Sequence, residues 1–528
     1  MGHSWRRYDK WALSVLLLIG FLIRVRGIEI DLIDHHCWRE GTEAMMARHF
    51  FRHGITVQYP HINGYSARPS VFVNEFPLYP ATLALAYREF GAENIVLGRL
   101  ISIACSLATA ALCYWLLRRH FNNSAPFWGA LLFVLSPLGS YVGRCLLRHP
   151  MAFFLMTLAF CLWLLWLERP TWRLWVGVWI CCALAVLTNF ANAYVGVPML
   201  AALLFHRGVK GLSDKRVWGL AGAIFLPTAL WIYHAMAFGA WFLTGQDGAK
   251  QRDFGRFLRL EWWNSEFFSS LADHLYRMVF TPMGCLLAAL GLLLYWRSPL
   301  AWIVRIWAVS VFAYLAFDHY VVYIVVHDYY FLHALFPGCL AAGIGCGALV
   351  DLSRRLSKRY PNVCALGASV LLLPLVFWSW RVWDAPLKES FLVTEPGWIQ
   401  NWVPAGKAIQ AKTEKDAVLV VDREIDALIY LCDRPGWVTN WRTLDEATIR
   451  SLIEAGADYL LITKYTMGEN GRFTGYLFDD PKEGSPAAPW VRAHCAVIED
   501  ASTFQIVDLT PDRPAQVESA APPGGEDG

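Results

Sequence analysis

The stretch IVLGRLISIACSLATAALCYWLL, residues 95–117, is apolar at almost every position and is followed at once by Arg118 and Arg119. A helix needs roughly 20 apolar residues to cross the hydrocarbon core of a bilayer, which is ~30 Å thick. The stretch meets that length and ends in the positive charge that is retained on the cytoplasmic side. It therefore predicts a membrane-spanning helix whose orientation can be assigned.

The composition of the whole chain agrees with this interpretation. Of the 528 residues, 56% are hydrophobic and 17% are charged, whereas a soluble domain carries about a quarter charged residues. The net charge is only +3, and no long basic tract is present. The composition therefore predicts a membrane protein and excludes nucleic acid as a partner.

Ten further runs resemble the first in length or composition. The eleven runs together lie at about 11–30, 95–117, 125–143, 150–167, 174–190, 192–206, 217–243, 276–296, 299–319, 331–351 and 362–381. The first could also be a signal peptide, but no small-residue cleavage site follows it, which favours an uncleaved anchor. The predicted fold is a polytopic α-helical membrane protein with about 11 transmembrane helices.

The basic residues of the loops between these runs set the expected orientation. With the N-terminus in the cytoplasm, alternate loops are short and rich in Arg and Lys, as the positive-inside rule requires. The remaining loops are long, as at 31–94 and 244–275, or carry balanced charge. Both long loops and the C-terminal part are therefore expected outside.

The pattern of the chain changes after residue 382. Three short apolar stretches, AVLVVD (417–422), DYLLIT (458–463) and FQIVDL (504–509), have the pattern of strands. The helical pattern of residues 443–456 lies between the first two, which predicts a small α/β domain. We therefore expect a membrane domain over 1–382 and an external α/β domain over 383–511.

Two smaller expectations concern the C-terminal part. Residues 512–528 have almost nothing to bury and are expected to be disordered. Cys432 and Cys495 lie outside the apolar runs, and they could form a disulfide in an oxidising compartment or remain two free thiols.

The densest cluster of titratable groups lies in DHHCWREGTE, residues 34–43, directly after the first apolar run. Acidic and basic groups at a membrane boundary are costly and commonly mark a functional site, although a solvated turn has the same composition. A second block, NEFPLYP (74–80), places an acid at the other end of the same external loop. The two blocks make this loop the first candidate for a site.

Three stretches together resemble a known family. WREGTEAMMARHFFRHG (38–54), EFPLYP (75–80) and HDYYFLHALFP (327–337) are similar to motifs of the GT-C class of glycosyltransferases, and most of all to its bacterial family 39-type members. Those enzymes are relatives of protein O-mannosyltransferases and of the aminoarabinose transferase of lipid A. The segment 422–437 also resembles the start of the C-terminal domain in that subgroup.

The resemblance implies a transferase in the inner membrane of a bacterium. Its donor would be a sugar linked to polyprenyl phosphate, and its acceptor a lipid, a glycan or a protein on the external face. A transporter or flippase of lipid-linked sugars is the first alternative, but the apolar runs show no repeated halves. An inactive, transferase-like assembly protein is the second.

The family's aspartates fall on Arg39, Glu40 or Thr42 of this chain, depending on the motif used for alignment, and none is kept as an aspartate. A carboxylate must take the proton of the acceptor hydroxyl as the sugar–phosphate bond breaks. We therefore expect the base to be Glu40, then Glu43, then Asp34, in that order of preference.

The leaving phosphate needs cationic or hydroxyl partners, or a divalent metal ion. The residues expected to bind substrate or phosphate are Arg39, Glu75, Arg144, His327 and Tyr330. A divalent metal ion could be held by Glu75, His35 and His36. His149 stands where the family tends to carry an acid, which weakens a metal site shared between two loops.

Overall fold

The computed structural model describes residues 4–33, 35–238, 254–296, 298–319, 322, 325–356, 359–391, 402–422, 426–464, 466–467, 473–474, 478 and 484–510. Asp34, residues 244–253 of the expected loop 244–275 and the expected tail 512–528 lie outside these residues.

Contacts within the chain divide it into two units. The helical unit comprises Met1–Glu29, Ile55–Gln58 and Val73–Leu392, and the mixed unit comprises Ile30–Gly54, Tyr59–Phe72 and Val393–Gly528. From the sequence, all of loop 31–94 is predicted to belong to the membrane domain. The structure instead groups most of its first half with the C-terminal residues, because helix α2 (Cys37–His53) packs on helix α21 (Asp426–Cys432).

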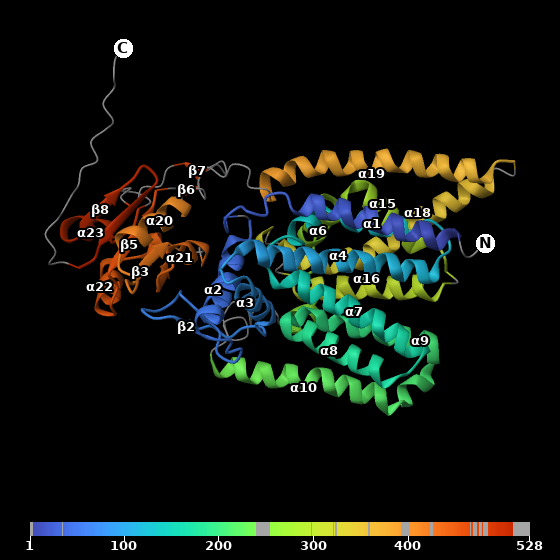
Figure 1. Cartoon of the computed structure of the whole chain (residues 1–528), viewed down its shortest axis with the longest axis horizontal. Helices are drawn as coiled ribbons and strands as arrows, with labels where there is room; N and C mark the ends of the chain where they lie inside the picture. Colours follow the sequence, from blue (N-terminus) through green and yellow to red (C-terminus); the bar gives the residue numbers. More distant parts are fainter. Residues whose placement is uncertain are drawn as a thin grey trace, which may run out of the picture. The chain divides into compact units, whose positions relative to one another are not determined.

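The long helices of the helical unit run side by side (Figure 1). Its elements are α1 (Ser4–Arg24), α3 (Leu78–Phe90), α4 (Ile95–His120), α5 (Ala125–Leu135), α6 (Pro137–Val142), α7 (Arg148–Glu168), α8 (Trp172–Thr188), η1 (Phe190–Val195), α9 (Gly196–Arg207), η2 (Val209–Ser213), α10 (Lys215–Ala237), α13 (Phe254–Leu258), α14 (Ser265–Asp273), η3 (His274–Val279), α15 (Thr281–Leu293), α16 (Pro299–Phe317), η4 (Val325–Phe331), α18 (Leu332–Leu356) and α19 (Pro361–Phe391).

Each of the eleven predicted apolar runs overlaps at least one helix in the described part of the chain, so the prediction of a polytopic helical membrane protein is confirmed. Within the described residues, six helices are long and apolar enough to cross a membrane by themselves. A seventh candidate, Ser265–Val279 with Thr281–Leu293, is bent by 108° at its break. Several runs are broken or short, as where Ser136 separates α5 from α6, so the described helices do not match the eleven runs one to one.

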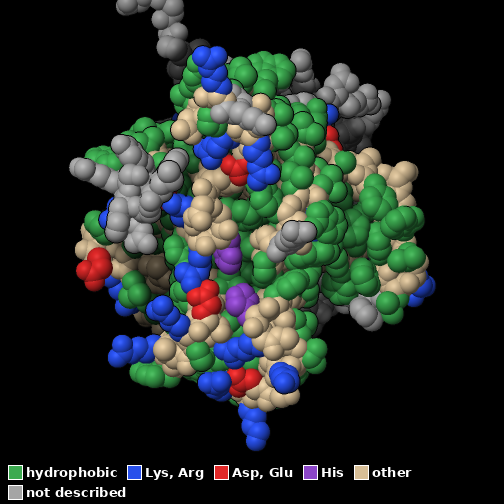
Figure 2. All heavy atoms as spheres, turned by 90° about the vertical axis from the view of Figure 1, so that its right-hand side faces the viewer, with side chains coloured by type: hydrophobic (Ala, Val, Ile, Leu, Met, Phe, Trp, Pro, Cys, Tyr) green, Lys and Arg blue, Asp and Glu red, His purple; other side chains and the backbone are tan. Residues whose placement is uncertain are grey.

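Basic side chains cluster at the ends of these helices. Figure 2 looks onto the face nearest the N-terminus, and Lys and Arg side chains are spread over it. The exposed basic residues of the alternate loops are Arg119, Arg169, Arg173, Lys210, Lys215, Arg216, Arg355 and Arg359. These are the residues on which the predicted orientation depends.

Glycines bring α18 close to its neighbours in the core of the helical unit. A Cβ atom on Gly343 would lie 2.7 Å from the carbonyl oxygen of Ala125 and 2.9 Å from the nitrogen of Gly129, both on α5. On the same helix, a Cβ atom on Gly345 would lie 2.3 Å from the carbonyl oxygen of Leu287 on α15. Small residues allow this close approach, which is the main way in which helices associate in lipid.

The mixed unit contains α2 and the C-terminal elements. Its elements are α2, β1 (His61–Ile62), β2 (Ser70–Val71), α20 (Trp402–Lys412), β3 (Leu419–Asp422), α21, β4 (Gly436–Thr439), η6 (Trp441–Thr443), α22 (Glu446–Glu454), β5 (Tyr459–Thr463), β6 (Thr466–Met467), β7 (Phe473–Thr474), α23 (Ala488–His494), β8 (Ala496–Asp500) and β9 (Phe504–Asp508). The predicted α/β architecture and its three predicted strands are therefore confirmed.

A five-stranded sheet with the order β4-β3-β5-β9-β8 forms the centre of this unit. Strand β3 pairs in parallel with both β4 and β5, and β9 pairs antiparallel to β5. Buried side chains such as Val420, Trp441, Ile449 and Leu460 make its core. An isolated bridge joins Ser66 to Gly436 of the edge strand β4, which ties part of the first loop to the sheet.

The cysteines are not cross-linked. All 13 are free thiols, and each is buried or half-buried. Cys432 and Cys495 therefore follow the second alternative, two separate thiols.

Candidate functional site

Helix α2 carries two of the three predicted acids, Glu40 and Glu43. It ends at Gly54, whose φ of 103° suits a residue without a side chain. We call residues 39–43 the acid turn. Its two glutamates, Glu40 and Glu43, are three residues apart, so they project from the same face of the helix. Their exposed fractions are 0% and 1%. Such complete burial is rare for carboxylates, so this face holds two acidic groups that are shielded from water.

A second face of the acid turn packs on α21. A Cβ atom on Gly41 would lie 2.6 Å from the backbone nitrogen of Ala427, so only glycine permits this approach. Beside it, the hydroxyl of Thr42 donates a hydrogen bond of 2.5 Å to Oδ2 of Asp426, the first residue of α21. This hydrogen bond therefore connects α2 to α21 within the mixed unit.

Asp426 has further partners in the same unit. The phenol of Tyr65 also donates to its carboxylate, and the charge of Arg39 acts on it. Burial is the main cause that raises the pKa of Asp426, while the three partners oppose that rise. Burial and the nearby Asp426 together raise the pKa of Tyr65. Tyr65 has a φ of 74°, a costly conformation for a residue with a side chain, which the surrounding contacts must maintain.

The other end of α2 is fixed by charge. Arg48 donates to the carbonyl oxygen of Tyr430 at 2.8 Å and to Asp433 at 3.0 Å, and its guanidinium lies 3.9 Å from the centre of the Tyr430 ring. Arg52 makes two further hydrogen bonds to Asp433. Both ends of α2 are thus attached to α21.

In the helical unit, Glu75 is held by its neighbours in sequence. The backbone nitrogen of Phe76 donates to the carbonyl oxygen of Leu187, and the indole of Trp231 donates to the carbonyl oxygen of Asn74. With its backbone fixed on both sides, Glu75 forms a buried ion pair of 2.7 Å with Arg148 at the start of α7. Glu75, which we expected to bind substrate or a metal ion, therefore forms an ion pair with an arginine of the protein itself.

The next residue along α7 meets the aromatic motif 327–331. The ring of His149 lies 4.3 Å from that of Tyr329 and 6.2 Å from that of Tyr330, centre to centre. The hydroxyl of Tyr329 lies 2.9 Å from Nδ1 of His327. The start of α7 therefore brings together two of the predicted phosphate- or sugar-binding residues, His327 and Tyr330, with Glu75 and Arg148.

Arg144, also expected to contact phosphate, is 2% exposed. It donates to the carbonyl oxygen of Gly27 at 3.2 Å, and its guanidinium lies 5.4 Å from the centre of the Tyr141 ring. Arg99 donates to the carbonyl oxygen of Ile28 in the same segment. In both bonds the acceptor is a backbone carbonyl, so the two buried guanidiniums converge on residues 27 and 28, which follow α1.

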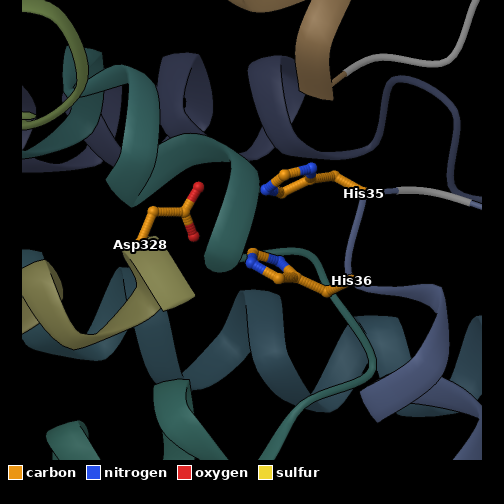
Figure 3. A group of neighbouring side chains, drawn as sticks. All are labelled: His35, His36 and Asp328. Carbon is orange, nitrogen blue, oxygen red and sulfur yellow. The ribbon is translucent and has the colours of Figure 1, made fainter. Parts of the chain in front are cut away.

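The expected metal ligands are divided between the units. His35 and His36 belong to the mixed unit, and their rings meet edge to face with centres 4.7 Å apart. Glu75 belongs to the helical unit and is paired with Arg148. Figure 3 shows the two imidazole rings, and it also draws Asp328 of η4. Two adjacent imidazoles offer two nitrogen ligands of the kind that divalent transition metals prefer.

Four residues that the sequence analysis did not choose take part in these arrangements: Thr42, Tyr65, Arg148 and Asp426. In the sequence, Arg148 lies in the charged stretch 144–149 together with Arg144 and His149, which is the signal that could have identified it. Asp426 lay inside the segment 422–437 that resembles the family, but nothing in the sequence joined it to Thr42. Asp34 lies outside the described residues, and none of the other predicted roles is tested by geometry alone.

The helical unit, in which six described helices are long and apolar enough to cross a membrane, is that of a multi-pass membrane protein. Residues 74–234 match the family model for dolichyl-phosphate-mannose-protein mannosyltransferase. No curated protein matches the sequence of the chain.

Three solved structures have a similar fold at low identity. The apo oligosaccharyltransferase of Archaeoglobus fulgidus aligns over 90% of this chain and 75% of its own, with a TM-score of 0.62 and 12% identity. The oligosaccharyltransferase AglB of the same organism, in complex with an inhibitory peptide and a dolichol-phosphate, aligns over 91% and 76%, with a TM-score of 0.58 and 13% identity. ArnT from Cupriavidus metallidurans, bound to undecaprenyl phosphate, aligns over 97% and 100%, with a TM-score of 0.57 and 14% identity.

These comparisons place the chain in the GT-C glycosyltransferase superfamily. The family resemblance inferred from three short motifs is therefore confirmed at the level of the superfamily.

Proposed function

We propose that the protein is a membrane glycosyltransferase that moves a sugar from a polyprenyl-phosphate carrier to an acceptor hydroxyl on the external face of a bacterial inner membrane. The observation that carries this proposal is the acid turn, where two buried glutamates share one face of α2. The fold supports it, because AglB and ArnT were solved with dolichol-phosphate and undecaprenyl phosphate.

The chemistry requires a base next to the acceptor. The acceptor oxygen attacks the anomeric carbon, the bond from that carbon to the phosphate oxygen breaks, and the acceptor proton passes to a carboxylate. Glu40 is our first candidate for this carboxylate and Glu43 the second. Both are buried, so each would act in a medium of low dielectric constant, where charge interactions are strong.

The leaving polyprenyl phosphate needs positive charge. In the helical unit, Arg148 pairs with Glu75 and adjoins His149, which contacts Tyr329. We assign the carrier phosphate to this group, together with Arg144, His327 and Tyr330. Arg39 of the acid turn is assigned to the sugar or phosphate, as expected from the sequence. Guanidiniums and hydroxyls stabilise charge on phosphate oxygens in this way.

The direct test is a transfer assay. The purified protein is incubated with polyprenyl-phosphate sugars and a panel of lipid, glycan and peptide acceptors, and loss of the donor is measured. Glu40→Gln and Glu43→Gln should lower the rate by about 10²- to 10⁴-fold where the residue is the base. Glu454→Gln, on the exposed end of α22, is the matched control. A wild-type protein that consumes no donor, or two glutamine variants as active as wild type, would exclude the proposal.

The proposed orientation has its own test. Lys210 and Ser451 are both exposed, the first between α9 and α10 and the second on α22. Because all 13 native cysteines are at least half-buried, a single added cysteine gives a clean signal. A membrane-impermeant maleimide should label Ser451→Cys in intact cells and leave Lys210→Cys unlabelled. The reverse pattern would place the mixed unit in the cytoplasm.

A further inference from the structure

Asp426 lies at a distinctive place in the mixed unit. Strand β3 is flanked in parallel by β4, the next strand in sequence, and by β5 on its other side. The connection after β3 leads to β4 on one side, and the connection after β4 returns past β3 to β5 on the other. In open parallel sheets, ligand-binding residues gather at the carboxyl ends of the strands where the strand order reverses in this way. Asp426 opens α21, the helix that follows β3, and is only 9% exposed.

The contacts of Asp426 all lead to the acid turn or to its surroundings. Its carboxylate receives hydrogen bonds from Thr42 and Tyr65 and is near the charge of Arg39. Arg39 and Thr42 are three residues apart, so they form one stripe along α2. Glu40 and Glu43 form the neighbouring stripe, turned by about 100°. Fixing the first stripe therefore fixes the direction of the second.

We propose that Asp426 is a positioning residue for transfer: through Thr42 and Arg39 it sets the rotation of α2 that aims Glu40 and Glu43 at the acceptor. This inference rests on the proposed function. It makes the C-terminal α/β domain a working part of the active site, because the carboxylate that orients the acid turn comes from that domain.

Asp433 provides a natural contrast. It lies just after α21 and binds Arg48 and Arg52, which are two to three turns further along α2 than the acid turn. Both aspartates attach the same helix to the same domain. Loss of either should loosen this attachment, but only loss of Asp426 should change the rotation of the acid turn.

The first experiment is a double-mutant cycle in the intact, detergent-solubilised protein. Asp426→Asn keeps one acceptor oxygen but removes the charge, and Thr42→Val removes the hydroxyl without changing the size of the side chain. Each should lower kcat about 10- to 100-fold, with KM for the donor within about twofold. Their effects should be non-additive, with a coupling of about tenfold. Thr42→Ser should restore kcat, and Asp433→Asn should leave kcat near the wild-type value.

The outcomes separate the inference from the proposed function. No turnover by the wild type would exclude the proposed function. Turnover by the wild type that Asp426→Asn matches would overturn the positioning role alone. A residual rate in Asp426→Asn that no longer falls on the acidic side of the pH profile would also overturn it, because Asp426 would then be the base itself.

A second measurement does not depend on turnover. Hydrogen exchange of the amides in residues 40–46 should be at least about tenfold faster in Asp426→Ala than in the wild type, because the acid turn loses its anchor. Asp433→Asn should accelerate exchange only towards residues 48–54. Unchanged exchange of residues 40–46 in Asp426→Ala would overturn the positioning role even where activity has fallen.

Discussion

Arg148 donates to Glu75 over 2.7 Å, and the two side chains are only 4% and 11% exposed. The pair joins the start of α7 to the segment before α3, within the helical unit. Breaking a buried pair by removing one partner leaves an uncompensated charge and costs about 3–5 kcal/mol. Glu75→Ala and Arg148→Ala should therefore each lower the thermal unfolding temperature strongly.

The control for this pair is the double substitution Glu75→Gln with Arg148→Gln. It removes both charges and should be more stable than either alanine variant, because no buried charge is left alone. Thermal unfolding of the detergent-solubilised protein measures all of these variants. Alanine variants that unfold at the wild-type temperature would show that the pair is not a structural link.

Gly41 sets the distance between α2 and α21. Because the atoms that a Cβ would meet belong to the backbone of Asp426 and Ala427, they cannot move aside as a flexible side chain can. Gly41→Ala should destabilise the mixed unit by about 1–3 kcal/mol and lower transfer. Gly64→Ala is the matched control, since its Cβ would meet its nearest atom at 3.9 Å. Equal thermal stability of the two variants would contradict the proposed close approach.

His49 makes the stability of the mixed unit depend on pH. Burial is the main cause that lowers the pKa of His49, with additional repulsion from His53, His61 and Arg52. The unfolded chain takes up a proton near the usual pKa of 6.5, while the folded protein does so only at lower pH. Stability from this residue is therefore present above pH 6.5 and is lost as the pH falls through the lowered pKa.

The corresponding measurement is thermal unfolding between pH 5 and pH 8. His49→Gln should flatten the pH dependence of the unfolding temperature on the acidic side. His53→Gln should reduce it in part, because one source of repulsion is gone. A wild-type protein whose unfolding temperature rises on acidification over this range would contradict the prediction.

Because the imidazoles of His35 and His36 lie next to each other, we expect transfer to depend on a divalent metal ion. Treatment with a chelator should lower transfer, and Mn²⁺ or Mg²⁺ should restore it. His35→Gln with His36→Gln should weaken binding of Mn²⁺, measured by its paramagnetic resonance signal in the purified protein. Full activity in the presence of the chelator would remove the metal ion from the proposal, while the roles of Glu40 and Glu43 would stand.

The helical architecture was predictable because a single physical property decides it. Long apolar runs such as 95–117 must lie in lipid, and their backbone groups must be satisfied within a helix. The number of spans was not predictable in the same way. Ser136 breaks the run 125–143, and the run 276–296 includes a π-helical turn and a sharp bend, so hydropathy alone does not show where a crossing begins.

The acid turn was predictable as a cluster but not as part of a fold. The spacing of Glu40 and Glu43 gives their common face, and Gly54 gives the end of the helix. Nothing local to residues 39–43 indicates that Asp426 receives the hydroxyl of Thr42, because such a contact depends on the tertiary arrangement of the chain. Likewise, the pairing of Glu75 with Arg148 could not be read from either motif.

The hydrogen bond between Thr42 and Asp426 joins residues 384 positions apart in the chain. During synthesis, the acid turn leaves the ribosome long before its partner exists, and the helices from α3 to α19 are made in between. A contact this distant in sequence forms late, since the intervening chain must be ordered first. The catalytic machinery that we propose would thus be completed only by a segment translated after the membrane helices, so that a chain interrupted before residue 426 could insert those helices and still be unable to consume its lipid donor.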